Sequence, residues 1–352
     1  MKGSYTLIVP ALDRTGPVNV AVDIGAAAHA AGWQVRLLYL TTMPPRDDLG
    51  FAAEVRQFRL SDFWQLSGVV HTHCLRPDLL GLALTRNRKI TLITTIHNNF
   101  LFDLGFAKPR LYVDAAWQVW RWSLRGFDMV ICISEAMRRH YCRRLHDSQL
   151  HVAYNFRAQP PNLPAASSTL EWIARRKQVG NVVLSFVGAL SELKNIKGLL
   201  EALADAPAIS LIVCGQGHLR ESLEVLVRHK HLQDRVRFEG HVPSPAAIMR
   251  HTDALILPSH TEGFPLVVIE AASVGVPALL SNIAVHRELA DLGFGKTFDH
   301  RRFSDLESAA YALHRAIPAP STTLVNLWFE GFTPSAGFAR YEALISTVRK
   351  PL

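Results

Sequence analysis

Short apolar runs rich in valine, isoleucine and leucine alternate with longer helical patterns along the whole chain. In the first half these runs are YTLIVP, QVRLLYL, GVVH, KITLITTIH, DMVICIS and LHVAY. Each is a few residues long and apolar on both faces, which is typical of parallel strands covered by helices. Helix-length segments lie between them, such as NVAVDIGAAAHAAG, for which Gly32 is the expected C-cap. The pattern therefore predicts a doubly wound α/β sheet.

Residues 156–168, FRAQPPNLPAASS, interrupt this pattern with three prolines and no periodicity, so we predict a linker there. A second βα series follows, with the runs NVVLSFVG, ISLIVCG, RVRFEG, DALILP and VPALLS. We expect one Rossmann-like domain over residues 1–158 and another over residues 169–335. Two such halves favour a ligand cleft between them, at the carboxyl ends of the strands.

Composition excludes several classes of protein. The chain has 352 residues, 49% hydrophobic and 19% charged, which fits two domains and excludes disorder. Its four cysteines form no CxxC pair, so we expect no disulfide framework, no structural zinc and a reducing compartment. No apolar run reaches the roughly 18–20 residues that cross a bilayer. The N-terminus has a short apolar core over residues 7–10 and indicates a buried strand rather than a signal peptide, which predicts a cytoplasmic protein.

The chain carries an excess of positive charge. Lysine and arginine number 38 against 30 acidic residues, a formal charge of +8. This favours anionic partners such as nucleotides, phosphates, acidic lipid or nucleic acid. Because no recognisable nucleic-acid module is present, we expect no nucleic-acid partner.

The segment ALILPSHTEGFPLVVIEAASVGVPALLS holds two glutamates with seven residues between them. Glu262 lies in a polar loop after a buried strand, and Glu270 lies over one turn into the following helix. Unpaired amides and the helix dipole at such a helix start favour an anion. Taken alone, the two glutamates are more typical of a helix cap at Glu262 and a solvated helix residue at Glu270. The residues at the helix start are Gly263, Phe264, Pro265 and Leu266.

This segment, with the VPALLS strand after it, resembles the Glu-x7-Glu signature of retaining GT-B-fold glycosyltransferases (group 1, family 4), which use nucleotide sugars. The resemblance implies two Rossmann-like domains facing each other across a cleft. It implies that Glu262 contacts the donor sugar, that the following amides hold the sugar and diphosphate, and that Glu270 binds the ribose hydroxyls. It also implies that the C-terminal helix, residues 336–352, packs back on the N-terminal, acceptor-side domain.

The segment LSFVGALSELKNIKGLLEAL resembles the strand–GRL–x3–Lys element of that family, in which an arginine and a lysine neutralise the donor diphosphate. Gly188 and Lys194 match, whereas Ala189 stands at the arginine position. A cation clamping a departing diphosphate is often worth several kcal/mol. We hypothesise that Lys197, at the start of the next helix, compensates in part; a single lysine there is otherwise typical of a solvated charge.

Two further elements resemble the family's nucleotide-binding loops. LIVCGQGHL matches its strand–GxG turn through Gly215 and Gly217, and RVRFEGHV matches the strand whose loop, with His241 and Val242, lies beside the base. As a dinucleotide fingerprint the turn is weak, because Arg220 takes the place of the third glycine.

The N-terminal half resembles the family less sharply. Residues 15–17 match its Gly-rich first loop, in which Gly16 permits close approach to donor phosphates. His71, His73 and His97 follow apolar runs at the expected cleft edge, and His97 matches the histidine near the transferred sugar. A structural hydrogen-bonding role stays open for His97. We expect His71 and His73 to alternate faces, so that at most one lines the cleft.

Aromatic and basic residues gather on two predicted helices of this half, in PRLYVDAAWQVWRWSLRGF and in SEAMRRHYCRRL, where Ser134 is the expected N-cap. This mixture favours contact with an anionic membrane surface and a lipid-linked acceptor. The alternative is a core of aromatics with a solvated basic face. The residues concerned are Trp117, Trp120, Arg121, Trp122, Arg125, Phe127, Arg138, Arg139, Arg143 and Arg144.

Together the resemblance implies a retaining hexosyl- or N-acetylhexosaminyltransferase that moves a sugar from a nucleotide-diphosphate donor, most often a UDP-sugar, to an acceptor hydroxyl. Lipopolysaccharide, capsule or other cell-surface glycans are the expected products. No metal, cofactor or covalent nucleophile is implied, and the enzyme would work in the cytoplasm or at the inner face of the membrane. The alternatives are a non-catalytic nucleotide-sugar-binding subunit, which Ala189 keeps open, and a GT-B-like nucleotide-sugar epimerase.

Overall fold

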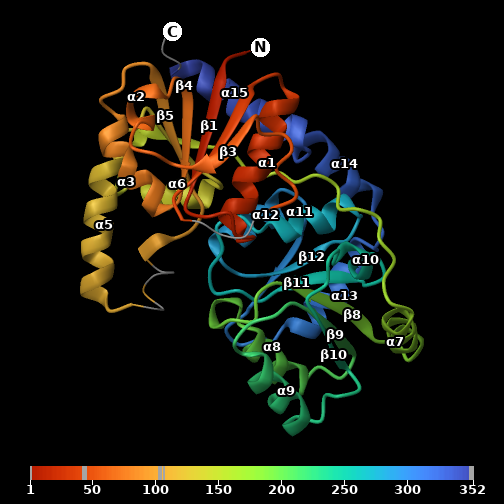
Figure 1. Ribbon diagram of the computed structural model, residues 1–352. Helices are drawn as coiled ribbons and strands as arrows, with labels where there is room; N and C mark the ends of the chain where they lie inside the picture. Colours follow the sequence, from red (N-terminus) through yellow and green to blue (C-terminus); the bar gives the residue numbers. More distant parts are fainter. Residues whose placement is uncertain (1, 42–45, 102–104, 106–107, 349–352) are drawn as a thin grey trace. The chain divides into compact units, whose positions relative to one another are not determined.

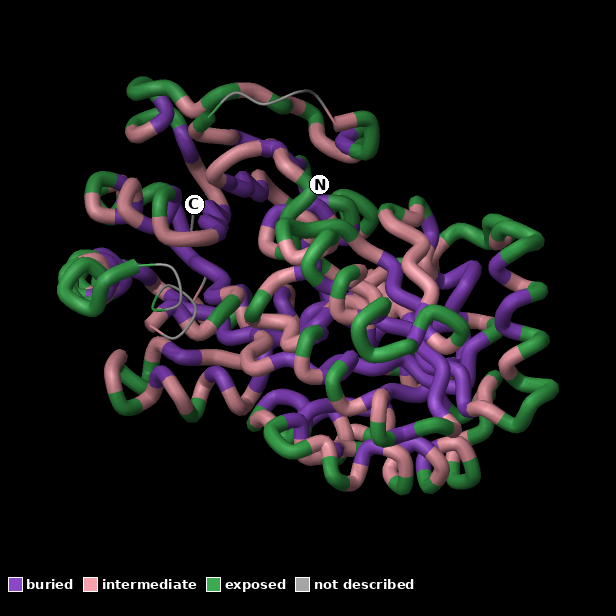
Figure 2. The backbone as a smooth tube through the Cα atoms, turned by 90° about the horizontal axis from the view of Figure 1, so that it is seen from below, coloured by how far each residue is buried: buried purple, intermediate pink, exposed green. Residues whose placement is uncertain are grey.

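The chain forms two compact units, Met1–Ala158 with Gly331–Leu352 (unit 1) and Gln159–Glu330 (unit 2) (Figure 1). The computed structural model describes residues 2–41, 46–101, 105 and 108–348. Each unit has one parallel sheet with helices between successive strands, which confirms the α/β class. Most strand residues are buried, and Figure 2 shows exposed residues gathered on the outer turns of the chain.

Unit 1 contains a seven-stranded sheet in the order β3-β2-β1-β4-β5-β6-β7. Its strands are β1 (Ser4–Val9), β2 (Gln34–Tyr39), β3 (Glu54–Gln57), β4 (Gly68–His73), β5 (Ile90–Ile96), β6 (Met129–Cys132) and β7 (Leu150–Val152). The winding reverses between β1 and β4, so the chain has a topological switch point there. Six strands match the predicted apolar runs. The sequence pattern missed β3, because this edge strand reads EVRQ and has no buried residue.

Over the described residues of unit 1, six helices and one short 3-10 turn accompany this sheet. They are α1 (Gly16–Ala30), α2 (Asp62–Gln65), α3 (Leu75–Leu84), α5 (Arg110–Leu124), α6 (Glu135–Tyr141), η1 (Asp147–Gln149) and α15 (Pro334–Val348). Gly32, the predicted C-cap, lies just past α1 with a φ of 93°. Ser134 caps α6 as predicted, because its side chain accepts a hydrogen bond from the amide of Met137 at 3.1 Å.

The C-terminal helix α15 packs on unit 1. Glu342 accepts hydrogen bonds from the Trp33 indole at 2.8 Å and from Lys2 at 2.6 Å. The ring of Phe338 lies 5.9 Å from that of Tyr5. Gly337 permits this packing, since a Cβ there would lie 2.2 Å from Phe156.

Unit 2 contains a six-stranded sheet in the order β10-β9-β8-β11-β12-β13, which reverses between β8 and β11. Its strands are β8 (Val182–Val187), β9 (Ile209–Cys214), β10 (Val236–Gly240), β11 (Ala254–Leu257), β12 (Ala278–Ser281) and β13 (Gly295–Phe298). The short edge strand β13 was not predicted. The helical elements are α7 (Ser167–Gln178), η2 (Glu192–Lys194), α8 (Ile196–Leu203), α9 (Arg220–His229), α10 (Ala246–Met249), α11 (Leu266–Ser273), α12 (Ala284–Asp291), α13 (Leu306–Ala316) and α14 (Thr322–Gly331).

A buried carboxyl group ties together four elements of unit 1. Asp78 on α3 accepts hydrogen bonds from Thr72 on β4 at 2.5 Å, from Thr94 on β5 at 2.7 Å and from the Trp120 indole on α5 at 2.7 Å. Burial raises the pKa of Asp78 to about 7, although the three donors favour its charged form. The charged carboxylate is therefore a destabilising feature of the native state.

This pKa predicts a pH dependence of stability. Between about pH 4 and 7, Asp78 in the native protein keeps a proton that the unfolded chain has released. The contribution of Asp78 to the free energy of unfolding therefore falls as the pH rises. In Asp78→Asn one acceptor oxygen remains for the three donors, so overall stability drops. From pH 5 to 7 the wild type should nevertheless lose unfolding free energy relative to Asp78→Asn, by up to about 1.4 kcal/mol per pH unit.

Urea unfolding followed by tryptophan fluorescence would measure this, since five of the seven tryptophans belong to unit 1. The exposed Asp234→Asn serves as the control. Parallel pH profiles for wild type and Asp78→Asn would contradict the prediction.

Candidate functional site

The switch point of unit 2 brings together a lysine and a glutamate that lie 68 positions apart. Lys194 ends the turn η2 after β8, and Glu262 lies in the loop after β11. Lys194 Nζ donates to Glu262 Oε1 at 2.5 Å, and Ser259 Oγ donates to the same oxygen at 2.7 Å. The two charged side chains are 25% and 10% exposed, so a ligand can still reach them. Adjacent parallel strands end at the same edge of the sheet, which is why these loops meet.

Glu262 is held in its charged form. Burial alone would raise the pKa of its carboxyl group, but the Lys194 ammonium and the hydrogen bond from Ser259 hold that pKa below its usual range. A charged carboxylate accepts strong hydrogen bonds from hydroxyl groups, and the neighbouring ammonium attracts anions. The pair therefore offers an acceptor for the hydroxyl groups and a cation for the phosphate of a phosphorylated polyol.

A second layer of hydrogen bonds supports the Glu262 loop. Ser281 Oγ donates to the carbonyl of Ser259 at 2.7 Å, and His286 Nδ1 lies 2.8 Å from Ser281 Oγ. Because the serine proton is already engaged, His286 Nδ1 must be the donor. Burial lowers the pKa of His286 to about 4, so the ring is neutral. The sequence interpretation missed Ser259, Ser281 and His286, and only the place of Ser259 in the polar loop hinted at such a role.

Two predicted glycines hold the neighbouring loops together. A Cβ at Gly215 would lie 1.8 Å from the carbonyl oxygen of Gly188, and one at Gly217 would lie 2.3 Å from that of Leu190. Gly188 donates to the Cys214 carbonyl at 3.0 Å, and Leu190 to the Gln216 carbonyl at 2.9 Å. The loop after β9 thus supports the loop that carries Lys194, and a side chain at either glycine would separate them.

The loop after β10 adjoins this arrangement, since Gly215 donates to the Gly240 carbonyl at 2.6 Å. His241, predicted to lie near the base, is exposed there. Val242 is half-buried against a core cluster that includes Trp172.

The predicted helix start lies at α11. Pro265 is the N-cap, with the helix beginning at Leu266, and Gly263 and Phe264 are buried before it. Glu270 is half-exposed, one turn into the helix. The structure therefore places the two predicted glutamates on the loop and on the helix that this loop begins.

Lys197, near the start of α8, has an acidic neighbour on the same helix. Its Nζ lies 3.9 Å from Glu201 on the same helix, and its side chain is 71% exposed. Ala189 is exposed after β8. Lys194 is thus the lysine that the structure pairs with Glu262, and Lys197 is oriented toward Glu201.

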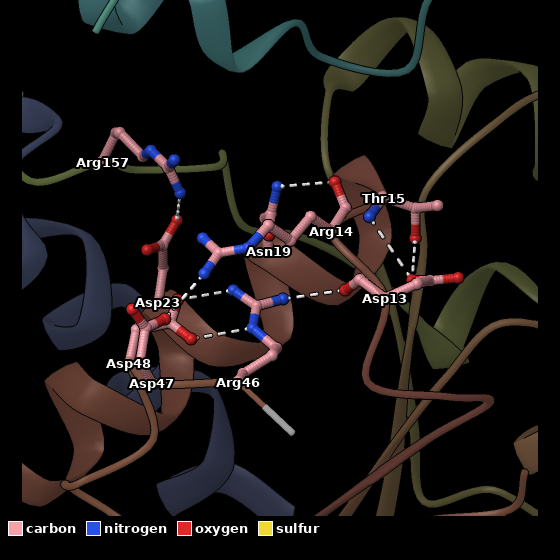
Figure 3. Close-up of polar contacts among 9 residues, drawn as sticks. All are labelled: Asp13, Arg14, Thr15, Asn19, Asp23, Arg46, Asp47, Asp48 and Arg157. Carbon is pink, nitrogen blue, oxygen red and sulfur yellow. Dashed lines mark hydrogen bonds and ion pairs between the residues drawn. The ribbon is translucent and has the colours of Figure 1, made fainter. Parts of the chain in front are cut away.

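In unit 1 the loop between β1 and α1 is held by a buried arginine (Figure 3). The Arg46 side chain is 4% exposed, donates to the Asp13 carbonyl at 2.8 Å and pairs with both carboxylate oxygens of Asp48. Thr15 Oγ1 donates to the Asp13 carboxylate at 2.7 Å. Gly16 then begins α1, and a Cβ there would meet nothing within 4 Å, so the helix start is open to a ligand.

A cavity of about 330 Å³ lies at the carboxyl ends of β4 and β5, next to the start of α1. His97, the predicted sugar-proximal histidine, is one of its lining residues. The lining is mainly apolar and aromatic, with a few polar groups, as is usual in small-molecule sites. Its residues are Pro17, Cys74, Leu75, Thr95, Ile96, His97, Asn98, Phe100 and Trp120.

Two buried histidines of β4, His71 and His73, adjoin His97. His73 Nδ1 lies 2.8 Å from His97 Nε2, and His71 lies 2.8 Å from both Tyr5 and Thr95. The expectation that His71 and His73 alternate faces is wrong: their rings are 4.2 Å apart, because residues two apart on a strand point to the same face. Burial lowers the pKa of His97 to about 3, which keeps it neutral.

The aromatic cluster of this unit divides between core and surface. Trp117, Trp120 and Phe127 are buried, whereas Trp122 is 59% exposed. Over the described ranges, no helix has the length and apolar character to span a bilayer. The same residues contain no group of three or more histidine, cysteine or acidic side chains arranged to hold a metal ion, and all four cysteines are free.

Two family descriptions match different parts of the chain. Residues 171–309 match Glycosyl transferases group 1, and residues 14–157 match Glycosyltransferase Family 4. The O-antigen biosynthesis glycosyltransferase WclY of Escherichia coli is 27% identical over 285 residues, which cover 78% of this chain and 77% of that protein.

Crystal structures of Alr3699/HepE from Anabaena share the fold. The complex with UDP aligns with a TM-score of 0.79 at 16% identity and covers 98% of this chain and 100% of that one. The complex with UDP-glucose aligns with a TM-score of 0.77 at 17% identity, over 97% and 99% of the two chains. These similarities confirm the predicted two-domain GT-B fold, and the chain belongs to the GT-B glycosyltransferases.

Proposed function

We propose that this glycosyltransferase moves a hexosyl or N-acetylhexosaminyl group from a UDP-sugar to an acceptor hydroxyl with retention of configuration. The observation that carries the proposal is the Lys194–Glu262 pair at the switch point of unit 2, supported by Ser259. The UDP and UDP-glucose complexes of the HepE structures support the choice of donor. The similarity to WclY supports a role in cell-surface glycan assembly, such as lipopolysaccharide or capsule.

The proposed reaction is mainly one of positioning and charge stabilisation. Lys194 and the amides at the start of α11 hold the departing diphosphate, Glu262 binds hydroxyl groups of the sugar, and Glu270 binds the ribose. The acceptor oxygen attacks the anomeric carbon on the face from which the diphosphate leaves. A diphosphate oxygen takes the acceptor proton, so no protein nucleophile is needed. The lysine and the amides supply the positive charge without a metal ion.

We assign the acceptor to the cavity beside His97 in unit 1. Its aromatic lining, which includes Phe100 and Trp120, suits the apolar face of a sugar ring, and neutral His97 can exchange hydrogen bonds with a hydroxyl. The four free cysteines favour work in a reducing cytoplasm, and a lipid-linked acceptor would place the enzyme at the inner face of a membrane.

A nucleotide-sugar-binding subunit without activity is the second candidate. Ala189 removes one cation from the family pattern, and the exposed Lys197 lies 3.9 Å from Glu201 on its own helix. This deficit lowers the positive charge available to a leaving diphosphate.

The role of Lys194 can be tested by kinetics. We expect Lys194→Gln to lower kcat by about 100- to 1,000-fold, because a donor to the developing negative charge is lost. The exposed Lys197→Gln should change kcat less than about twofold. Since Lys194→Gln leaves buried Glu262 without its cation, the Lys194→Gln/Glu262→Gln double variant should recover thermal stability but not activity. Equal losses in the two single variants would instead identify Lys197 as the second cation.

Thermal-shift measurements across nucleotides test the donor assignment. UDP should raise the unfolding temperature more than GDP or ADP, and at 100 times its Kd it should add about 2.7 kcal/mol. Glu270→Gln should weaken the shift produced by UDP but not that produced by pyrophosphate, which has no ribose. Glu201→Gln is the matched control on an exposed helix position. An equal loss of the pyrophosphate shift would contradict the ribose role of Glu270.

The stereochemical and metal predictions share one assay. Incubation with UDP-sugars and an extract of acceptor glycolipids should give a product with the donor's anomeric configuration by proton NMR, and EDTA should not slow its formation. Inversion would contradict the retaining mechanism, and a loss reversed by Mg²⁺ or Mn²⁺ would contradict metal independence. Nucleotide-sugar binding without any transfer would establish the subunit alternative.

A further inference from the structure

Helix α5 is apolar on two opposite sides. Its inner side packs into unit 1 through Val113, Trp117, Trp120 and Leu124, all at most 5% exposed. Its outer side carries Leu111 at 83% exposure, Tyr112 at 56%, Val119 at 51% and Trp122 at 59%. An amphipathic helix of a soluble domain normally presents polar residues on that outer side, so these exposed side chains need another explanation.

The exposed residues form one stripe along the helix. At 3.6 residues per turn, Leu111, Ala115, Val119 and Trp122 follow each other on one face, with Tyr112 beside them. In the described part of the chain, eleven large hydrophobic residues are exposed, and four belong to this fifteen-residue helix. In Figure 1, α5 lies at the margin of unit 1, beside α3 and away from α1. Such a concentration marks an interaction surface rather than scattered surface residues.

Arginines border the stripe along one side. Arg121 and Arg125 lie one turn apart at the end of α5, and Arg143 and Arg144 follow α6. These four line a common recess of about 160 Å³. Among residues that the structure describes, no carboxylate forms an ion pair with Arg121, Arg125 or Arg143. The recess is thus a strongly positive site bordering an apolar surface.

We infer that this α5 face, namely Leu111, Tyr112, Val119 and Trp122 with Arg121, Arg125, Arg143 and Arg144, docks on an anionic lipid bilayer. The stripe enters the boundary between headgroups and acyl chains, as interfacial helices do, and the arginines bind lipid phosphates. Charge complementarity favours this occupant, because a bilayer of anionic lipids offers many phosphates and no fixed carboxylates to match. The inference adds a partner to the proposed transfer to a lipid-linked acceptor. The use of the surface rests on that transfer, whereas the surface itself is argued from the residues of α5 and α6.

Co-sedimentation of the full-length protein with vesicles tests the inference. We expect binding to vesicles of phosphatidylglycerol and phosphatidylcholine at low salt, little binding to phosphatidylcholine alone, and release at high salt. Leu111→Gln/Trp122→Gln should weaken binding by about tenfold or more. Arg125→Glu/Arg143→Glu should weaken it by about fivefold per charge or more. These four positions are exposed, so the variants should keep the wild-type unfolding temperature.

Matched controls lie elsewhere on the surface. Phe329→Gln removes an aromatic side chain that is 69% exposed in unit 2, and Arg86→Glu/Arg88→Glu reverses two exposed charges of unit 1. Neither should change vesicle binding. Wild-type protein that stays in the supernatant with anionic vesicles at low salt would overturn the inference. So would equal binding by the α5 variants, or a dimer in gel filtration that Trp122→Gln dissociates, since a second copy would then cover the face.

Transfer to a water-soluble acceptor separates this result from the proposed function. If the wild type transfers sugar but ignores vesicles, the docking surface is wrong and the glycosyltransferase assignment stands. If vesicles bind but no transfer occurs, the docking surface stands and the proposed transfer is wrong.

Discussion

The site of unit 2 depends on one ion pair. A carboxylate as buried as that of Glu262 is unstable without a cation, and Lys194 supplies the cation from a loop 68 residues away. That meeting requires β8 and β11 to be neighbours in a parallel sheet, with their carboxyl ends at the same edge. The order of the strands therefore determines the chemistry, because any other neighbour for β11 would leave Glu262 without its partner.

The loops around this pair are positioned by backbone contacts more than by side chains. Gly215 and Gly217 let the loop after β9 approach the loop after β8 closely. Ser281 holds the Glu262 loop through its hydrogen bond to the Ser259 carbonyl. Unit 1 follows the same principle with different groups, since Arg46 holds the loop before α1 through the Asp13 carbonyl. In both units the ends of the strands are fixed, so little ordering remains to be done when a ligand binds.

The sequence was sufficient for the α/β class and for eleven strands, because buried parallel strands are apolar on both faces. It failed at β3 and β13, whose segments EVRQ and GKTF lie at sheet edges and carry no such signal. Glu262, Glu270 and Lys194 were predicted by resemblance, and the structure pairs Lys194 with Glu262. Ser281 and His286 were not, because their role exists only once β11 and β12 are side by side. The error on His71 and His73 was one of periodicity, since strand alternation puts residues two apart on one face.

The exposed Ala189 changes how donor binding must work in the proposed reaction. With alanine at position 189, the lysine assigned to the diphosphate in that reaction is the one that pairs with Glu262 in the free protein. When Lys194 moves to the phosphates, Glu262 must find other donors, and its hydrogen bond from Ser259 keeps it oriented while it does so. Sugar hydroxyl groups are the donors that arrive at that moment. In the proposed reaction, diphosphate and sugar recognition would therefore be coupled. A nucleotide without a sugar would draw the cation away and leave a buried carboxylate poorly compensated, so the site would favour the nucleotide sugar over the free nucleotide.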